Sequence, residues 1–180
     1  MGLLPRDVVL AHLNAEGEIP GAVRWATHHG LEHSWDEEHL LLTVRLHGPA
    51  RENDAREEYL LSGTVDDYRV IPPAWRFLDP RDGADIGKAA FPAPGPFGVG
   101  SILHTNGVIC APWNRLAYAN ETGLHSNWTD LAKWESLEPN NTQARSIPDM
   151  LARIRAEVAM SPRRLEPLPP KDVPHEGTAS

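Results

Sequence analysis

The sequence predicts one α+β domain in which a helix comes first, a four-stranded antiparallel meander follows, and helices close the chain. Three observations predict it. Polar and apolar residues alternate over residues 40–47, and apolar residues recur at helical spacing over residues 146–160. Residues 81–100, between these patterns, are rich in Gly and Pro and have no period. The composition, 41% hydrophobic and 23% charged over 180 residues, fits a folded domain with a single core.

The first helix is expected over residues 6–16. Val9 and Leu13 lie one helical turn apart there, and Gly17 follows as a stop signal. Residues 23–27 then alternate, with Val, Trp and Thr at every second position, and this pattern favours a first strand.

The remaining strands are expected to follow in a meander. Residues 40–47 predict a half-buried strand, and "YLLSGTVDDYRV", residues 59–70, predicts the next one after a polar connection. In "IPPAWRFLDP", residues 71–80, two prolines end that ladder and an aromatic segment follows. Four antiparallel strands should therefore be complete by about residue 78.

Two helices are expected after the long loop of residues 81–100. Thr129 is placed to cap "DLAKWESL", and Ser146 to cap the helix that follows it. The apolar stripe of that last helix consists of Ile147, Leu151, Ile154 and Val158. We expect residues 1–163 to form the domain and residues 164–180 to be a Pro-rich, disordered tail.

The charge and the cysteine content limit the class of protein. A net charge of −8 argues against a nucleic-acid partner, whose phosphates need clustered Lys and Arg. An uncharged apolar stretch of bilayer length is missing from the sequence, so we expect no membrane partner and a cytoplasmic location. A lone cysteine cannot form an internal disulfide, which fits a reducing compartment.

That lone cysteine, Cys110, ends the segment "NGVIC". Gly107 has no Cβ and suits a turn that needs a positive φ, and the apolar pair Val108 and Ile109 should anchor the chain in the core. Such an arrangement would present the Cys110 thiol at the edge of a cleft. A buried structural cysteine is the alternative interpretation.

Three segments, taken in order, resemble the ubiquitin-conjugating enzyme family. They are "DYRVIPPAWRF" (residues 67–77), "NGVIC" (106–110) and "SNWTDLAKW" (126–134). The residues of the first segment that are in register with the family are Asp67, Tyr68, Pro72, Pro73 and Phe77. The second resembles the segment that carries the family's thioester cysteine, and the third resembles the segment that opens its next helix. The match covers residues 59–160.

The resemblance implies a UBC-like fold and a transferase that holds a modifier as a thioester on Cys110. The implied partners are an activating (adenylating) enzyme, a ubiquitin-like modifier, a target protein and an associated peptidase, as in bacterial anti-phage operons. No cofactor is expected. We place partner binding at Trp113 and Trp128. A UBC-like module that only binds or scaffolds would be the alternative, although it should lack the cysteine.

The sequence departs from the family at two places. The His-Pro-Asn triplet should fall at residues 100–102, where Gly-Ser-Ile stands, so the Asn that stabilises the oxyanion is missing. The segment between Cys110 and Trp128 is also longer than in the family. The candidate donors are His104, which we prefer, Asn106, which we assign mainly to the turn, His125 in the longer segment, Asn114 and Asn127.

A second concentration of polar side chains is "HHGLEHSWDEEH", residues 28–39. Its histidines could bind zinc, but the spacing from His29 to His33 to His39 matches no familiar site. We expect a hairpin turn between the first two strands here, and no metal.

Overall fold

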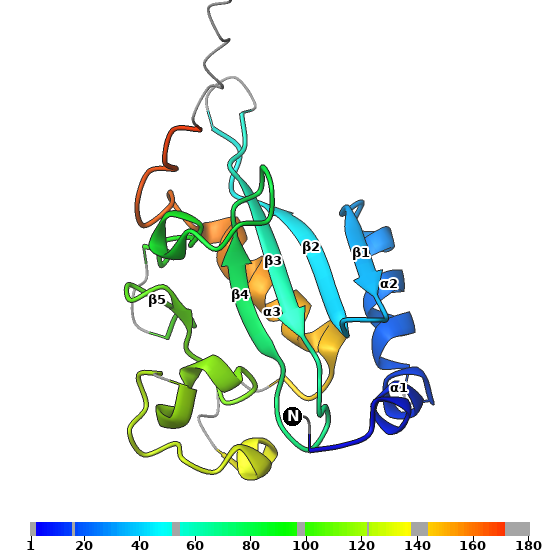
Figure 1. Cartoon of the computed structure of the whole chain (residues 1–180). Coiled ribbons are helices and arrows are strands. Elements are labelled where there is room, and N and C mark those ends of the chain that lie inside the picture. Colours follow the sequence, from blue (N-terminus) through cyan, green and yellow to red (C-terminus); the bar gives the residue numbers. More distant parts are fainter. Residues whose placement is uncertain are drawn as a thin grey trace, which may run out of the picture.

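The computed structural model describes residues 3–15, 17–51, 55–96, 100–121, 123–137 and 144–171. The protein has an α+β fold, with N-terminal helices, a four-stranded antiparallel sheet and a C-terminal helix (Figure 1). The α+β class, a helix at the N-terminus and the four-stranded antiparallel sheet are as predicted. Its main elements are α1 (Arg6–Ala15), α2 (Glu18–His28), β1 (His33–Asp36), β2 (Leu41–His47), β3 (Glu58–Thr64), β4 (Ala74–Leu78) and α3 (Ile147–Met160). The short elements are η2 (Gly87–Ala89), β5 (Leu103–His104), β6 (Val108–Ile109), η3 (Arg115–Ala117), η4 (Ala119–Glu121) and η5 (Leu131–Ser136).

The sheet is a meander in the order β1-β2-β3-β4, and neighbouring strands are antiparallel. Val44 in β2 lies opposite Leu61 in β3, and Leu61 lies opposite Phe77 in β4. Residues opposite one another share a face of the sheet, and all three are buried. The predicted meander and the alternation over residues 40–47 are therefore confirmed.

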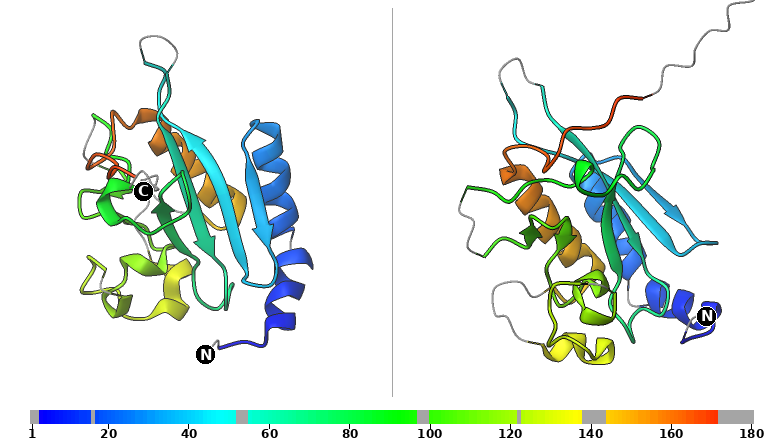
Figure 2. Two further views of the ribbon diagram at one scale, coloured as in Figure 1. Left: turned by 45° about the horizontal axis from the view of Figure 1, so that its top comes forward. Right: turned by 60° about the vertical axis from the view of Figure 1, so that its left-hand side comes forward.

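The helices α2 and α3 cover this buried face (Figures 1 and 2). Helix α3 contacts both β2 and α2. The predicted apolar stripe of α3 is buried along its length, from Ile147 to Val158. Ser146 caps the helix as predicted, because its Oγ accepts a hydrogen bond from the N–H of Asp149 at 3.3 Å. The core of the domain lies between these two helices and the sheet.

The predicted strand at residues 23–27 is wrong, because these residues belong to α2. The buried residues Ile19, Ala22 and Ala26 recur three and four positions apart, which is helical spacing. Small alanines form most of this buried stripe. In the sequence, the alternation of larger side chains at every second position is therefore the more conspicuous pattern. The first strand is β1, which lies in the polar segment expected to be only a turn.

A buried carboxylate joins α2, α3 and the segment of residues 67–77. Glu18 accepts hydrogen bonds from the N–H of Ile147 at 2.6 Å and from the hydroxyl of Tyr68 at 3.1 Å. Burial raises the pKa of the Tyr68 hydroxyl, so Tyr68 stays a donor to this carboxylate. The N-terminal helices are thereby fixed to the start of α3.

The C-terminal part differs from two expectations. The cap of η5 is Asp130 rather than Thr129, and η5 is a 3-10 helix. Arg164, assigned to a disordered tail, is 6% exposed, lies 4.4 Å from the centre of the Tyr59 ring and donates to the carbonyl of Ala90 at 3.0 Å. A boundary at residue 163 is thus too early, while residues 172–180 lie outside the described residues.

The described part of the loop at residues 81–100 is irregular apart from η2, as predicted. Beyond it, residues 103–121 pack beside β4, the edge strand of the sheet (Figures 1 and 2). Within the described ranges, none of the helices has the length and apolar character needed to cross a membrane.

Candidate active site

Cys110 follows a small hairpin that the structure forms at the predicted turn. Strands β5 and β6 pair antiparallel, with His104 opposite Val108. Gly107 between them has a φ of +82°, and its N–H donates to the carbonyl of His104 at 2.9 Å. This confirms the predicted positive φ. The N–H of Cys110 then donates to the carbonyl of Ile102 at 2.7 Å, which fixes the cysteine backbone to the preceding segment.

Asn114 anchors the cysteine segment to the sheet. Its side chain is fully buried, with Nδ2 donating to the carbonyl of Ile109 at 2.8 Å and Oδ1 accepting from the N–H of Trp75 in β4 at 2.9 Å. Trp75 in turn packs where Gly63 leaves room, because a Cβ at Gly63 would collide with the indole ring. The amide of Asn114 is therefore committed to backbone groups and is not placed to serve as an oxyanion donor.

The Cys110 thiol meets a histidine from the longer segment after it. Sγ of Cys110 lies 2.6 Å from Nε2 of His125, and both side chains are half-buried. The two residues are 15 positions apart in the chain, so the contact depends on the fold of the segment between them. A thiol in hydrogen-bond contact with an imidazole is the arrangement that nucleophilic cysteine chemistry requires.

Backbone contacts fold the segment between the two residues back on itself. Gly123 donates to the carbonyl of Tyr118 at 2.8 Å and lies so close to the backbone of Ala117 that a Cβ would collide with it. The N–H of His125 donates to the carbonyl of Ala117 at 3.2 Å, and Tyr118 and His125 form a parallel bridge. Glycine at residue 123 thus permits the close approach that brings His125 to the thiol.

The pKa values of Cys110 and His125 are both shifted so that each residue favours its neutral form. Burial raises the pKa of the Cys110 thiol. Burial, together with the nearby charge of His104, lowers the pKa of the His125 imidazole. At neutral pH the pair is therefore a thiol beside a neutral imidazole, not a thiolate beside an imidazolium. The neutral imidazole can accept a proton at the moment the sulfur attacks.

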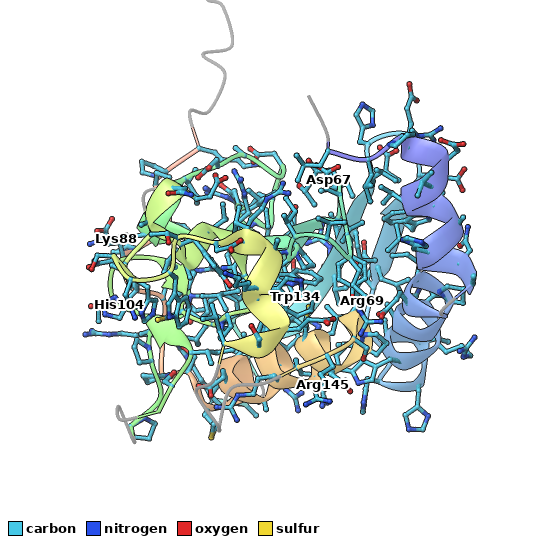
Figure 3. All side chains as sticks on the ribbon, turned by 90° about the horizontal axis from the view of Figure 1, so that it is seen from below. Asp67, Arg69, Lys88, His104, Trp134 and Arg145 are labelled. Atoms are coloured by element: carbon cyan, nitrogen blue, oxygen red, sulfur yellow. The ribbon has the colours of Figure 1, made fainter. Side chains whose placement is uncertain are left out.

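The preferred candidate, His104, bonds to the hairpin turn instead of the thiol. Its Nδ1 accepts from the N–H of Asn106 at 3.2 Å, which makes it a turn acceptor. In Figure 3 His104 lies on the same flank of the molecule as Lys88. Asn106 and Asn127 are exposed, and the structure brings neither to the Cys110 thiol. Of the candidates, only His125 reaches the sulfur.

The segment that stands where the family has its triplet has a structural role. The Oγ of Ser101 donates to Glu157 of α3 at 2.7 Å and accepts from the N–H of Leu103 at 3.1 Å. Ile102 is fully buried. These contacts fix the start of β5 against α3 and leave no donor directed at the thiol from these two side chains.

The placement of the two tryptophans argues against the predicted partner contacts. Trp113 is 1% exposed and belongs to the core, and Trp128 is 8% exposed. Indole rings buried to this extent offer little area to another protein. The large apolar area of these rings is buried inside the domain.

A groove of about 320 Å³ is lined by residues of the two segments that carry the pair, although neither Cys110 nor His125 is among its lining residues. Its lining includes Val108, two residues before Cys110, and Leu124, the neighbour of His125. Each chain segment that carries a reactive residue therefore also contributes an apolar residue to the groove. The groove is therefore a surface on these two segments where a second molecule could lie.

The polar segment at residues 28–39 does not assemble a metal site. His33 bonds to the carbonyl of Leu31 at 2.9 Å, and His39 pairs with Asp36 at 2.7 Å. Across the residues that the structure describes, no three His, Cys, Asp or Glu side chains come together as metal ligands. The expected hairpin is present in shifted form, because residues 33–36 are the strand β1 itself and residues 37–40 make the turn.

Comparisons of the whole chain with protein-family models, with curated proteins and with solved structures give no match.

Proposed function

We propose that this chain is a conjugating enzyme that carries a ubiquitin-like modifier as a thioester on Cys110 and transfers it to an amine of a target protein. The observation that carries the proposal is the 2.6 Å contact between Sγ of Cys110 and Nε2 of His125. A half-buried thiol with a neutral base at hydrogen-bond distance suits acyl transfer through sulfur.

The arrangement of the fold supports the same proposal. An N-terminal helix, a four-stranded meander, a cysteine beside the edge strand and a long C-terminal helix follow one another in the order that the resemblance implies. The segments at residues 67–77 and 106–110 also lie together, because Asn114 links Trp75 of the first to Ile109 of the second.

In the loading step, the modifier arrives as a thioester on the activating enzyme. Sγ of Cys110 attacks its carbonyl carbon, a new C–S bond forms, and the bond to the sulfur of the activating enzyme breaks. The thiol proton moves to Nε2 of His125 and then to the departing thiolate, so that the imidazole is neutral again. A neutral His125 is the form required to accept that proton.

In the transfer step, an amine of the target attacks the carbonyl carbon of the Cys110 thioester. The C–N bond forms, the C–S bond breaks, and the amine proton passes to Nε2 and on to Sγ. While it holds the proton, Nε2 can donate to the tetrahedral oxyanion, the task that the missing Asn performs in the family. The groove beside Val108 and Leu124 is where the target or the end of the modifier would lie.

The partners that follow are an activating enzyme, a modifier and a target protein, in a bacterial anti-phage pathway of the kind that the resemblance implies. A binding or scaffold module is the competing function. It shares the fold but has no need of a base beside the cysteine, and the contact of His125 with Cys110 therefore favours the enzyme.

Incubation with the cognate activating enzyme, modifier and ATP tests the proposal. Wild-type protein should gain a covalent adduct that thiol reductant removes. Cys110→Ser should give an adduct that resists reductant, because an oxygen ester is poorly cleaved by thiols. Cys110→Ala should give none while its fold persists, since loss of one half-buried sulfur leaves little cavity.

The control is the melting temperature of both variants, which should stay close to that of wild type. An adduct of unchanged yield and reductant sensitivity on Cys110→Ala would place the acceptor elsewhere. No adduct on wild-type protein, with the activating enzyme shown to be charged, would favour the binding module.

A further inference from the structure

Trp128 lies against the imidazole of His125 rather than at the surface. The ring centroids are 3.6 Å apart and the ring planes are inclined by only 13°, so the rings stack face to face. The other neighbour of the indole is Tyr118, at 5.5 Å between ring centroids. The hydroxyl of Tyr118, itself fully buried, donates to the carbonyl of Pro112 at 2.8 Å. The indole is thus held between a fixed core tyrosine and the reactive histidine.

The backbone around Trp128 is fixed as firmly as its ring. The N–H of Trp128 donates to the carbonyl of His125 at 3.0 Å, and its carbonyl accepts from the N–H of Ala119 at 3.1 Å. The backbone of His125 is fixed on the other side by its bond to Ala117. The remaining freedom of His125 is rotation of its side chain, and a flat ring at stacking distance opposes that rotation.

Reactive histidines in cysteine and serine enzymes are commonly oriented through their second ring nitrogen, by a carboxylate or an amide. Among the described residues, His125 contacts the Cys110 thiol through Nε2 and the Trp128 indole through its ring face. The ring is oriented from its face instead. A carboxylate would add a negative charge and favour the imidazolium, whereas an indole orients the ring without adding a full charge.

We propose that Trp128 is a positioning residue: by stacking on His125 it holds Nε2 at the Cys110 thiol, and it takes the place of the carboxylate or amide that orients the histidine in other Cys-His pairs. The inference concerns the reactivity of the pair itself, so it is testable without the activating enzyme or the modifier and does not depend on the proposed acceptor role.

The test is the second-order rate of Cys110 alkylation by iodoacetamide, measured from pH 5 to 10 on the full chain. His125→Ala should lower the rate at pH 7 by about tenfold or more, because the base that accepts the thiol proton is lost. Trp128→Leu should lower it by a similar factor, and Trp128→Phe, which keeps a flat ring, should stay within about threefold of wild type. All four proteins should converge at high pH, where the thiolate forms without a base.

The double variant distinguishes a positioning role of Trp128 from a general loss of folded structure. If Trp128 acts through His125, Trp128→Leu combined with His125→Ala should react no more slowly than His125→Ala alone. Trp134→Leu is the matched control. Trp134 is also buried, at 3% exposed, but its indole donates to the carbonyl of Arg69 and packs against Tyr68 rather than against His125. This control should lose stability and keep the wild-type alkylation rate.

A folded Trp128→Leu with the wild-type rate would overturn the inference, and so would losses that multiply in the double variant. Proton NMR of the wild-type protein gives an independent result if Trp128→Leu does not fold. The ring protons of His125 should lie upfield of those of His104, because the indole ring current acts on a stacked ring. Unshifted His125 ring protons would contradict the stack.

Discussion

His39 and His125 both lie in segments that connect regular elements, and their surroundings differ in exposure, in bonding partner and in the direction of the pKa shift. His39, in the turn between β1 and β2, is exposed and bonds to the carboxylate of Asp36 at 2.7 Å. His125 is half-buried and contacts a thiol on one side and an indole on the other. The hydrogen bond to Asp36 raises the pKa of His39, whereas burial lowers the pKa of His125.

The comparison teaches that the position of a histidine in this fold decides whether it serves as a charged partner or as a neutral base. The carboxylate of Asp36 favours the protonated form of His39, and their exposed ion pair contributes little to stability. Burial favours the neutral form of His125, which is able to accept a proton. Both histidines stand in polar segments of the sequence, so residue type alone does not tell which of them favours the charged form.

Asn114, which anchors the cysteine segment, and Asp36, which bonds to His39, should differ most in their effect on stability. Asn114→Ala should destabilise the protein by about 1–3 kcal/mol, because it leaves the buried N–H of Trp75 and the carbonyl of Ile109 without partners. Asp36→Asn should have a much smaller effect, since it removes only an exposed pair. Urea denaturation monitored by tryptophan fluorescence measures both.

Asn127→Ala is the matched control for the first variant, because Asn127 is an exposed asparagine in the same segment. It should unfold at the wild-type urea concentration. Equal effects of Asn114→Ala and Asn127→Ala would show that the cysteine segment does not depend on its buried anchor.

The pKa values of the two histidines should depart from the ordinary histidine value in opposite directions. Two-dimensional NMR should show His39 titrating above the ordinary histidine pKa and His125 below it. Asp36→Asn should return His39 toward the ordinary value and leave His125 unchanged, because the carboxylate is the main cause of the first shift.

The consequences for stability have opposite signs. A raised pKa in the folded state means that His39 adds stability that is fully present below its unfolded pKa and is lost as the pH rises through the folded value. The lowered pKa of His125 means that the unfolded chain binds the proton first, so stability falls as the pH drops below the ordinary histidine range. A His125 that titrates above His39 would contradict the account of the site as a neutral pair.

Strand β2 could be predicted from the sequence, because alternation of apolar and polar residues over residues 40–47 is typical of a half-buried strand. Helix α2 could not, because its buried stripe is made largely of small residues, Ala22 and Ala26, while Trp25 dominates the pattern. The Pro-rich sequence around Arg164 predicts a disordered tail. The burial of Arg164 depends on Tyr59, far away in the chain, and no local pattern reports that contact.

In the candidate site, too, local features could be predicted and contacts between distant residues could not. The turn at Gly107 is a local feature, and its positive φ could be predicted from the sequence. The choice of His104 over His125 rested on closeness in the chain, since His104 is only six residues from Cys110. Gly123 was the available signal, because a glycine shortly before a histidine can permit the close backbone approach that brings it to the thiol. The stack with Trp128 needed the fold itself.

The most direct test of the central claim, that His125 is the base of a Cys110 thioester, is a single-turnover discharge of the preloaded thioester onto free lysine. With the same starting load, His125→Ala should discharge about 100-fold more slowly than wild type, because it loses the proton acceptor and the oxyanion donor. His39→Ala should discharge at the wild-type rate, and His104→Ala should stay close to it, since its imidazole serves the turn. Discharge of His125→Ala at the wild-type rate would contradict the account.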